Sequence, residues 1–227
     1  MMLAPVLLAV VGVLVFTVSA SAQNAPTRDE LAVYAGLHEA AAKGDVSEIE
    51  SLIKDGERPN IQDSKSRTPL HVAAYMKQHA AARALLRLGA NGNALEIDKY
   101  DIVTIAAVAN DIEMLKIALE GGASARNVTS RYEGTALIAA AHLGHAEVVK
   151  ILIAAKAPLN HVNNLGWTAL MESIVLGSGG ANHTATLRAL VEAGADVNIA
   201  DRQGVTPLQH ARRRGYVEMA QIGRAHV

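Results

Sequence analysis

Apolar residues recur along this chain in short helical blocks separated by polar, glycine-containing stretches. The clearest block spans 135–167, where an apolar run at 136–141 precedes a second run at 148–153 and then a polar link. Apolar side chains three and four positions apart predict two amphipathic helices. Such a pair buries too little apolar surface to offset the entropy of ordering it. The block therefore needs neighbours of its own kind.

The block recurs along almost the whole chain. The first helix of successive copies opens at Thr68, Asp101, Thr135, Thr168 and Thr206, at intervals of 33, 34, 33 and 38 residues. A side-chain oxygen at this position predicts a helix cap, so Asp101 should serve as well as Thr. A degenerate copy at 35–59 raises the number of copies to six. The fifth copy holds about five extra residues, 178–182, which we expect as a flexible insert between its helices.

Several motifs in these copies carry a resemblance to a known family. The second copy opens with Thr68-Pro69-Leu70-His71-Val72-Ala73, and similar pieces occur at 144–150 and 194–198. A period of 33 residues with this signature is similar to the ankyrin repeat, from residue 35 to about 222. The resemblance implies an all-α solenoid of six helix-turn-helix repeats joined by short hairpin-like loops. The segment 161–170 also resembles bacterial exported ankyrin-repeat proteins.

Local signals predict where individual helices begin and end. A capping box at Thr27 and Glu30 predicts one helix that runs to Lys43, followed by a second helix over Val46–Lys54. Glycines that should end the second helix of a copy with positive φ are Gly56, Gly89, Gly121 and Gly194. Lys156 takes this place in the fourth copy.

The N-terminal residues 1–22 carry no charged side chain. They hold a 16-residue apolar run, Leu3–Val18, and then the small-x-small pattern Ala20-Ser21-Ala22. The run is shorter than the roughly 20 residues of a membrane span, so we interpret 1–22 as a cleaved secretory signal; an uncleaved anchor is the alternative. Residues 23–34 then form a linker and the start of a capping helix, and 35–227 form the array. This interpretation predicts a periplasmic or secreted protein.

The last copy departs from the pattern. Gly223 falls where Leu152 stands in the fourth copy, and residues 222–227 match the translation of a common sequencing adapter. We therefore expect an artefactual C-terminus, with a naturally frayed end as the alternative.

Composition and charge exclude several classes of function. The chain has no Cys, which excludes a disulfide framework, a thiolate nucleophile and a Cys-ligated zinc site. Its net charge is −1, so no global field favours nucleic acid. We find no motif for a metal, a cofactor or a nucleophile, and the family resemblance gives His38 and His71 structural roles. The cluster at 212–214 is interpreted as a solvated end of the stack or a site for an acidic partner.

The resemblance implies that binding specificity lies in the loop tips and the inner-helix face. Tyr100, Tyr132 and Trp167 are 32 and 35 residues apart, which predicts an aromatic ladder on successive tips; for Trp167 a packing role is the alternative. Aromatic side chains and Arg are enriched in interface cores. The predicted partner-binding residues are Arg67, Tyr100, Arg131, Tyr132, Asn164, Leu165, Trp167, Arg202 and Gln203.

The sequence therefore predicts a non-catalytic protein–protein interaction scaffold in the periplasm or outside the cell. The alternative is a stabilising, chaperone-like accessory of an exported enzyme, and an enzyme hidden in the insert ranks last. The partner is expected to be a protein of unknown identity, with no nucleic acid. The membrane is involved only through an uncleaved signal segment.

Overall fold

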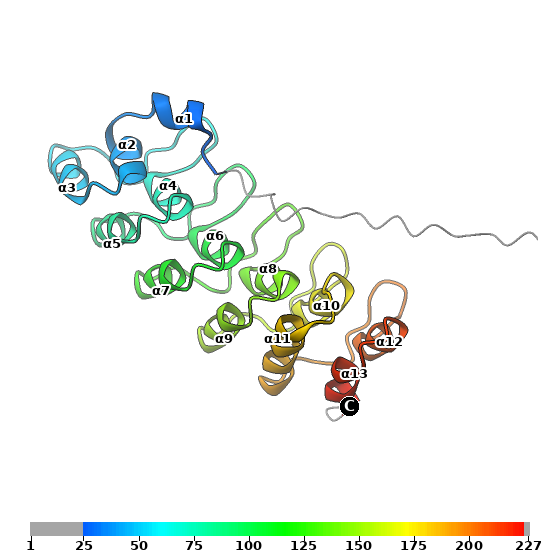
Figure 1. Ribbon diagram of the computed structural model, residues 1–227. Helices are drawn as coiled ribbons and strands as arrows, with labels where there is room; N and C mark the ends of the chain where they lie inside the picture. The colour runs from blue at the N-terminus through cyan, green and yellow to red at the C-terminus, as the bar shows by residue number, and fades with distance from the viewer. Residues whose placement is uncertain (1–24, 225–227) are drawn as a thin grey trace, which may run out of the picture.

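The computed structural model describes residues 25–224, and within that range the chain is all-helical (Figure 1). The predicted signal at 1–22 and residues 225–227 of the predicted artefact lie outside the described residues. The only bridge between extended segments found in the described range joins Thr129 to Gly134. Six helix pairs follow one another, which confirms the predicted all-α solenoid.

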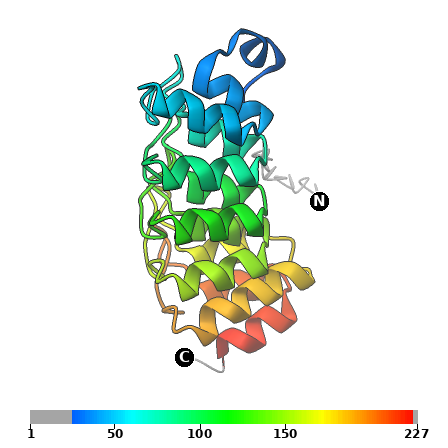
Figure 2. The same ribbon diagram turned by 90° about the vertical axis from the view of Figure 1, so that its left-hand side faces the viewer.

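The helices form two stacked layers that run the length of the molecule (Figures 1 and 2). A short helix, α1 (Arg28–Val33), precedes the array. The inner layer consists of α2 (Gly36–Lys43), α4 (Pro69–Tyr75), α6 (Ile102–Val108), α8 (Ala136–Leu143), α10 (Ala169–Val175) and α12 (Pro207–Arg213). The outer layer consists of α3 (Val46–Lys54), α5 (His79–Arg87), α7 (Ile112–Glu120), α9 (Ala146–Ala154), α11 (Ala181–Glu192) and α13 (Val217–Arg224).

The predicted caps of the inner helices are confirmed. The capping side chains, which each accept a hydrogen bond from the backbone N–H three residues on, are Thr68, Asp101, Thr135, Thr168 and Thr206. Each satisfies one of the N–H groups that a helix start leaves unpaired. The helix that follows Asp101 has seven residues, the same length as α4. The carboxylate therefore caps an inner helix as well as the Thr hydroxyl does.

Small residues let the layers approach each other closely. Ala73, Ala107 and Ala141 on the inner helices are 0% exposed, and Leu85 and Leu152 on the outer helices are equally buried. Protein interiors pack as densely as organic crystals, so a larger side chain at these Ala positions would push neighbouring helices apart. This packing explains why a chain with 3% aromatic residues still forms a continuous core.

The predicted single helix from Thr27 to Lys43 is wrong. The chain leaves α1 at Tyr34 (φ −65°, ψ 144°), stays extended at Ala35, and re-enters a helix at Gly36 with φ +55°. The physical reason is tertiary: the Tyr34 hydroxyl donates to Asp63 Oδ2 at 2.7 Å, and a continuous helix would not bring it there.

The helix-ending glycine of the third copy is also corrected. Gly122, with φ +89°, occupies the left-handed position that Gly56 and Gly89 take in other copies, whereas Gly121 has φ −79°. Lys156 adopts φ +64° at the equivalent position, as expected from its place in the fourth copy. A non-glycine residue is strained there because its Cβ crowds the following carbonyl group.

The insert in the fifth copy extends α11 and contacts the following repeat. Its last residues form the first turn of α11, which has 12 residues where α9 has nine. The Tyr216 hydroxyl donates to the Gly177 carbonyl oxygen at 3.0 Å. A Cβ at Gly179 would lie 2.5 Å from the Tyr216 ring, so the glycine is needed for this close approach.

At the C-terminal end, α13 continues through Gly223 to Arg224. Ile222 is 8% exposed and packs into the core, so the described part of the suspected artefact is helical. Across residues 25–224 no helix has the length and apolar character that crossing a membrane requires.

Candidate functional site

Five loops of equal length lie along one edge of the stack, on the left in Figure 2. We call them tip loops, and they span residues 60–67, 93–100, 127–134, 160–167 and 198–205. Each begins with an Asn and ends immediately before the cap of the next inner helix. Because the loops are in register, each position in one loop has a counterpart in the others.

The fourth residue of each tip loop holds its turn. One side-chain oxygen of Asp63, Glu96, Asn163 and Asp201 accepts hydrogen bonds from the backbone N–H groups two and four residues on, at 2.8–3.1 Å. Ser130 accepts the first of these bonds, at 3.2 Å. The sequence prediction missed this position. The available signal was an acceptor side chain three residues after each loop's Asn.

Hydrogen bonds also join neighbouring tips. The backbone N–H of Ile97 donates to the Lys65 carbonyl oxygen at 3.0 Å, and that of Asn164 donates to the Tyr132 carbonyl oxygen at 2.9 Å. Ser130 and Lys99 make the equivalent contact between the second and third loops, at 2.9 Å. The tips therefore form one connected surface rather than five independent loops.

Histidines tie the first two inner helices to the tip loops, as the family resemblance implied. The backbone N–H of Thr68 donates to His71 Nδ1 at 3.1 Å, and His71 Nε2 lies 3.0 Å from the Ala94 and 3.2 Å from the Tyr100 carbonyl oxygen. Carbonyl oxygens only accept, so this ring is neutral with its proton on Nε2. Burial lowers the pKa of His71 to about 4.

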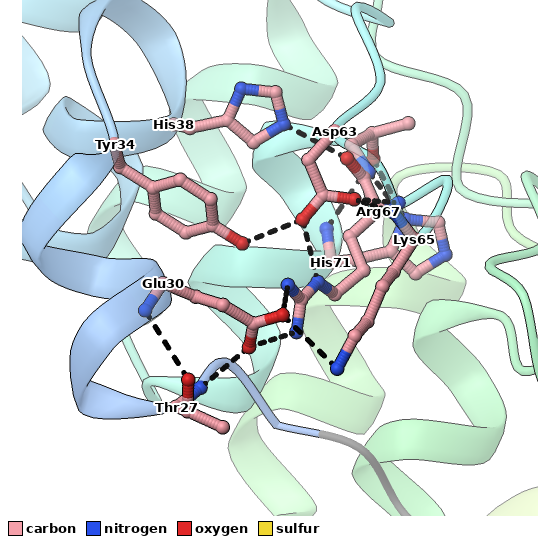
Figure 3. A network of polar contacts seen from close by, with 9 residues as sticks. Thr27, Glu30, Tyr34, His38, Asp63, Lys65, Arg67 and His71 are labelled. Atoms are coloured by element: carbon pink, nitrogen blue, oxygen red, sulfur yellow. Dashed lines mark hydrogen bonds and ion pairs between the residues drawn. The ribbon is translucent and has the colours of Figure 1, made fainter.

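Arg67 lies inside a polar network between α1 and the first tip loop (Figure 3). Its Nε donates to Asp63 Oδ2 at 2.7 Å, its Nη2 lies 3.0 Å from Glu30 Oε1, and its guanidinium carbon is 6.0 Å from the centroid of the Tyr34 ring. Only 1% of the Arg67 side chain is exposed. The structure thus contradicts an accessible Arg67: its charge is neutralised within the chain.

This network shifts the titration of its members. The hydrogen bond from the Thr27 backbone and then that from Arg67 lower the pKa of Glu30 to about 2. Burial alone would raise the pKa of Asp63, but hydrogen bonds from Tyr34 and Arg67 outweigh burial and lower it. Burial and the bond to Asp63 raise the pKa of Tyr34. Both carboxylates are therefore held in the charged form opposite Arg67.

The predicted aromatic ladder is wrong in its geometry. Tyr100 and Trp167 share the last position of a tip loop, the position that Arg67 takes in the first loop, whereas Tyr132 lies two positions earlier in its loop. Tyr100 is 9% exposed and packs in the core, and Trp167 is half-buried. The spacings of 32 and 35 residues differ from the repeat period, which is why the three rings are not equivalent.

The other six predicted residues do come together. They occupy the fifth and sixth positions of the last three tip loops, and we call them the C-terminal tip surface: Arg131, Tyr132, Asn164, Leu165, Arg202 and Gln203. All six are exposed, with Tyr132 at 39% and Leu165 at 40%. Asn164 links the three loops. Its side chain donates to the Arg131 backbone carbonyl oxygen at 3.1 Å, and its backbone carbonyl oxygen accepts a hydrogen bond from the Arg202 side chain. Whether these residues bind a partner stays a prediction.

Two histidines of the inner helices each pair with one carboxylate. His142 Nδ1 lies 3.0 Å from Glu172 Oε2, and His210 Nε2 lies 2.7 Å from Asp201 Oδ2. Within residues 25–224 no three His, Asp or Glu side chains are grouped to hold a metal ion. The Arg cluster at 212–214 is exposed at the end of α12, as expected.

Comparison with known proteins agrees with this architecture. A family model described as ankyrin repeats (3 copies) matches residues 37–127 and 103–201. The ankyrin repeat protein YahD of Escherichia coli (strain K12) is 34% identical over 184 residues, which cover 81% of this chain and 91% of YahD.

Solved structures show the same fold. The crystal structure of an ankyrin repeat domain (ABAYE2397) from Acinetobacter baumannii AYE has a TM-score of 0.80 and 41% identity, over 84% of this chain and 96% of that domain. A chain in the complex of the predatory endopeptidase Bd0816 from Bdellovibrio bacteriovorus with the immunity protein Bd3460 has a TM-score of 0.71, over 86% of this chain and 99% of that one. Its 22% identity shows the fold alone. By sequence and by fold, this chain belongs to the ankyrin-repeat family.

Proposed function

We propose that the chain is a protein-binding scaffold that captures its partner on the C-terminal tip surface. The solenoid supplies a long, connected edge, and this surface is the part where predicted contact residues are both exposed and adjacent. Repeat proteins use such extended surfaces for binding. The observation that carries the proposal is the pair Tyr132 and Leu165, two large apolar side chains that remain about 40% exposed on neighbouring tips.

Apolar exposure is concentrated on the tips as a whole. Of the ten large hydrophobic side chains that are exposed in the described range, seven lie in tip loops: Ile61, Leu95, Ile97, Val128, Tyr132, Val162 and Leu165. Single exposed apolar residues need no explanation, whereas a concentration along one edge is typical of an interaction surface. The outer helices show no comparable concentration within residues 25–224.

The proposed location is the periplasm or the outside of the cell, on the strength of the apolar segment at 1–22. In that compartment the scaffold would either hold a partner protein or, as the second candidate, stabilise an exported enzyme. Cell fractionation combined with mass spectrometry of the mature N-terminus tests the location. Recovery of an intact N-terminus in the cytoplasm would overturn it.

The binding role is tested by tagged capture followed by mass spectrometry. The double variant Tyr132→Ala, Leu165→Ala should lose its partner, since removing central anchors of an interface costs about tenfold or more in affinity each. The matched control is Val33→Ala, Val217→Ala, which removes two side chains exposed at 79% and 67% away from the tips. Equal recovery of the partner by both double variants would exclude the C-terminal tip surface.

The same capture separates the two candidate functions. If the partner is an enzyme whose activity falls when the scaffold is removed, the accessory function is supported. Stoichiometric binding without such an effect supports a simple scaffold.

A further inference from the structure

The carboxylates at the fourth position of the tip loops are turned inward. Asp63, Glu96 and Asp201 hold their turns, and their side chains are only 10%, 3% and 5% exposed. Asp201 is in addition paired with His210 at 2.7 Å. The negative charge at this position therefore makes internal contacts and does not face outward.

The cations of the C-terminal tip surface point outward. Arg131 is 66% exposed, and its single ion pair, with Asp98 at 2.6 Å, is of the exposed kind that contributes little to stability. Arg202 is exposed and bonds only to a neutral carbonyl oxygen among the contacts seen for it in the described range. Glu133 is the one exposed carboxylate in the last three tip loops. A chain with net charge −1 thus presents a locally basic edge.

Resting on the proposed function, we infer that the C-terminal tip surface binds an extended acidic segment of its partner, with two carboxylates that flank one apolar side chain. Arg131 and Arg202 lie two tips apart, and Leu165 lies on the tip between them. Charges of opposite sign guide association and fix the register of such a contact.

The spacing of the partner's residues follows from the stacking of the helices. Packed helices lie about 8–10 Å apart, so neighbouring tips are separated by about 10 Å. An extended chain advances about 3.3 Å per residue. One tip therefore corresponds to about three residues, and the pattern that fits is Glu-x-x-Leu-x-x-Glu, in which each Glu meets an Arg and the Leu meets Leu165.

The probe is a synthetic peptide Glu-Gly-Ser-Leu-Gly-Ser-Glu carrying a fluorophore, measured by fluorescence anisotropy against the full chain. Replacing both Glu by Gln should weaken binding about tenfold or more, and replacing them by Lys should abolish it. A peptide with the two Glu three residues apart should bind more weakly than the matched spacing. Raising the salt from 50 to 500 mM should weaken the acidic peptide severalfold, because salt screens exposed charges.

Variants of the protein test the same contacts. Arg131→Glu and Arg202→Glu should each weaken the peptide about tenfold, while Lys116→Glu on the exposed face of α7 should change affinity less than twofold. Asp98→Asn releases Arg131 from its internal partner and should tighten binding about two- to fivefold, a gain that misfolding would not produce.

The outcomes separate this inference from the proposed function. The inference of an acidic ligand is wrong if the Glu and Lys peptides bind equally. It is also wrong if Arg131→Glu and Arg202→Glu leave peptide affinity unchanged. If the captured natural partner is then still lost with Tyr132→Ala, Leu165→Ala, the binding surface stands and only the charge of its ligand is wrong. If neither set of variants affects any binding, both are wrong.

Discussion

Arg67 and Arg131 both lie in tip loops of eight residues, but Arg67 takes the last position of the first loop and Arg131 the fifth position of the third. Arg67 is 1% exposed and held by Glu30 and Asp63, whereas Arg131 is 66% exposed with one surface partner. Two features separate them: the last position of a tip loop is buried or half-buried in every loop, and α1 supplies Glu30 and leads to Tyr34 beside the first tip loop. No further helix covers the tips of the last three loops in the described range. Arg67 is thus enclosed by the chain itself, whereas Arg131 stays exposed on the C-terminal tip surface.

The comparison teaches that one backbone frame can hold an arginine inside a stabilising network at one end and expose another on the surface that we propose for recognition. The fourth-position side chain fixes the turn in both halves, so side chains at the following positions are free to vary. Their exposure depends on their position in the loop and on whether another part of the chain packs over them.

The largest expected effect comes from removing the Arg67 side chain from its buried network. Arg67→Ala leaves Asp63 and Glu30 without their buried partner, which should lower the free energy of unfolding by about 3–5 kcal/mol. Urea denaturation measures this loss in the free energy of unfolding. Arg131→Ala serves as the control and should leave the midpoint unchanged, because its pair is exposed. Equal urea midpoints for the two variants would contradict the difference between the enclosed Arg67 and the exposed Arg131.

Acid should weaken the N-terminal half first. His71 has a pKa of about 4 in the folded chain against 6.5 unfolded, so the unfolded chain binds the proton first. The stability that the neutral His71 ring contributes is present above pH 6.5 and is lost as pH falls to 4, by about 3 kcal/mol in total. Hydrogen exchange should show α4 and the tip loop 93–100 opening before α10 and α12.

The variant His71→Thr isolates this effect, because Thr104 holds the equivalent position in α6. Its stability should depend less on pH between 6.5 and 4. An unchanged slope would show that another group is responsible.

A substitution in the last helix, α13, should stabilise the array. Gly223 lies inside α13, and a Cβ there would have its nearest neighbour at 3.7 Å, an ordinary contact with Leu208. Gly223→Ala should raise the free energy of unfolding by about 1 kcal/mol, through higher helix propensity. Thermal unfolding followed by circular dichroism measures the gain, and a lower melting temperature would show that α13 is not held as described.

The smallest expected effect concerns the contact of α1 with the first tip loop, because the Glu30 side chain is 23% exposed and water screens its charge. The pKa of Glu30 is lowered to about 2, so its contribution is present above pH 4.5 and is lost as pH falls towards 2. Glu30→Gln should remove this part of the acid response and make α1 exchange faster. Carbon-detected NMR titration of Glu30 checks the value directly, and an ordinary midpoint near 4.5 would show that α1 does not hold Arg67.

The sequence by itself determined the repeat, its period and the helix caps, because these depend on residues close together in the chain. A Thr or Asp three residues before an N–H caps it in any context, and the 33-residue register then orders the tips. The residues of the C-terminal tip surface follow from that register. The turn-holding Asp63, Glu96 and Asp201 carried a signal of the same local kind, which was overlooked.

Only the tertiary structure decided which of the predicted contact residues reach the surface. The register places Arg67 at a different loop position from Arg131, but nothing local shows that Glu30, 37 residues away, neutralises Arg67. The break of the first helix at Tyr34 depends on the same long-range contact with Asp63. Tyr100 is buried in the core although it belongs to a tip loop, which a residue count cannot reveal. Burial and pairing depend on distant parts of the chain, whereas caps and periods do not.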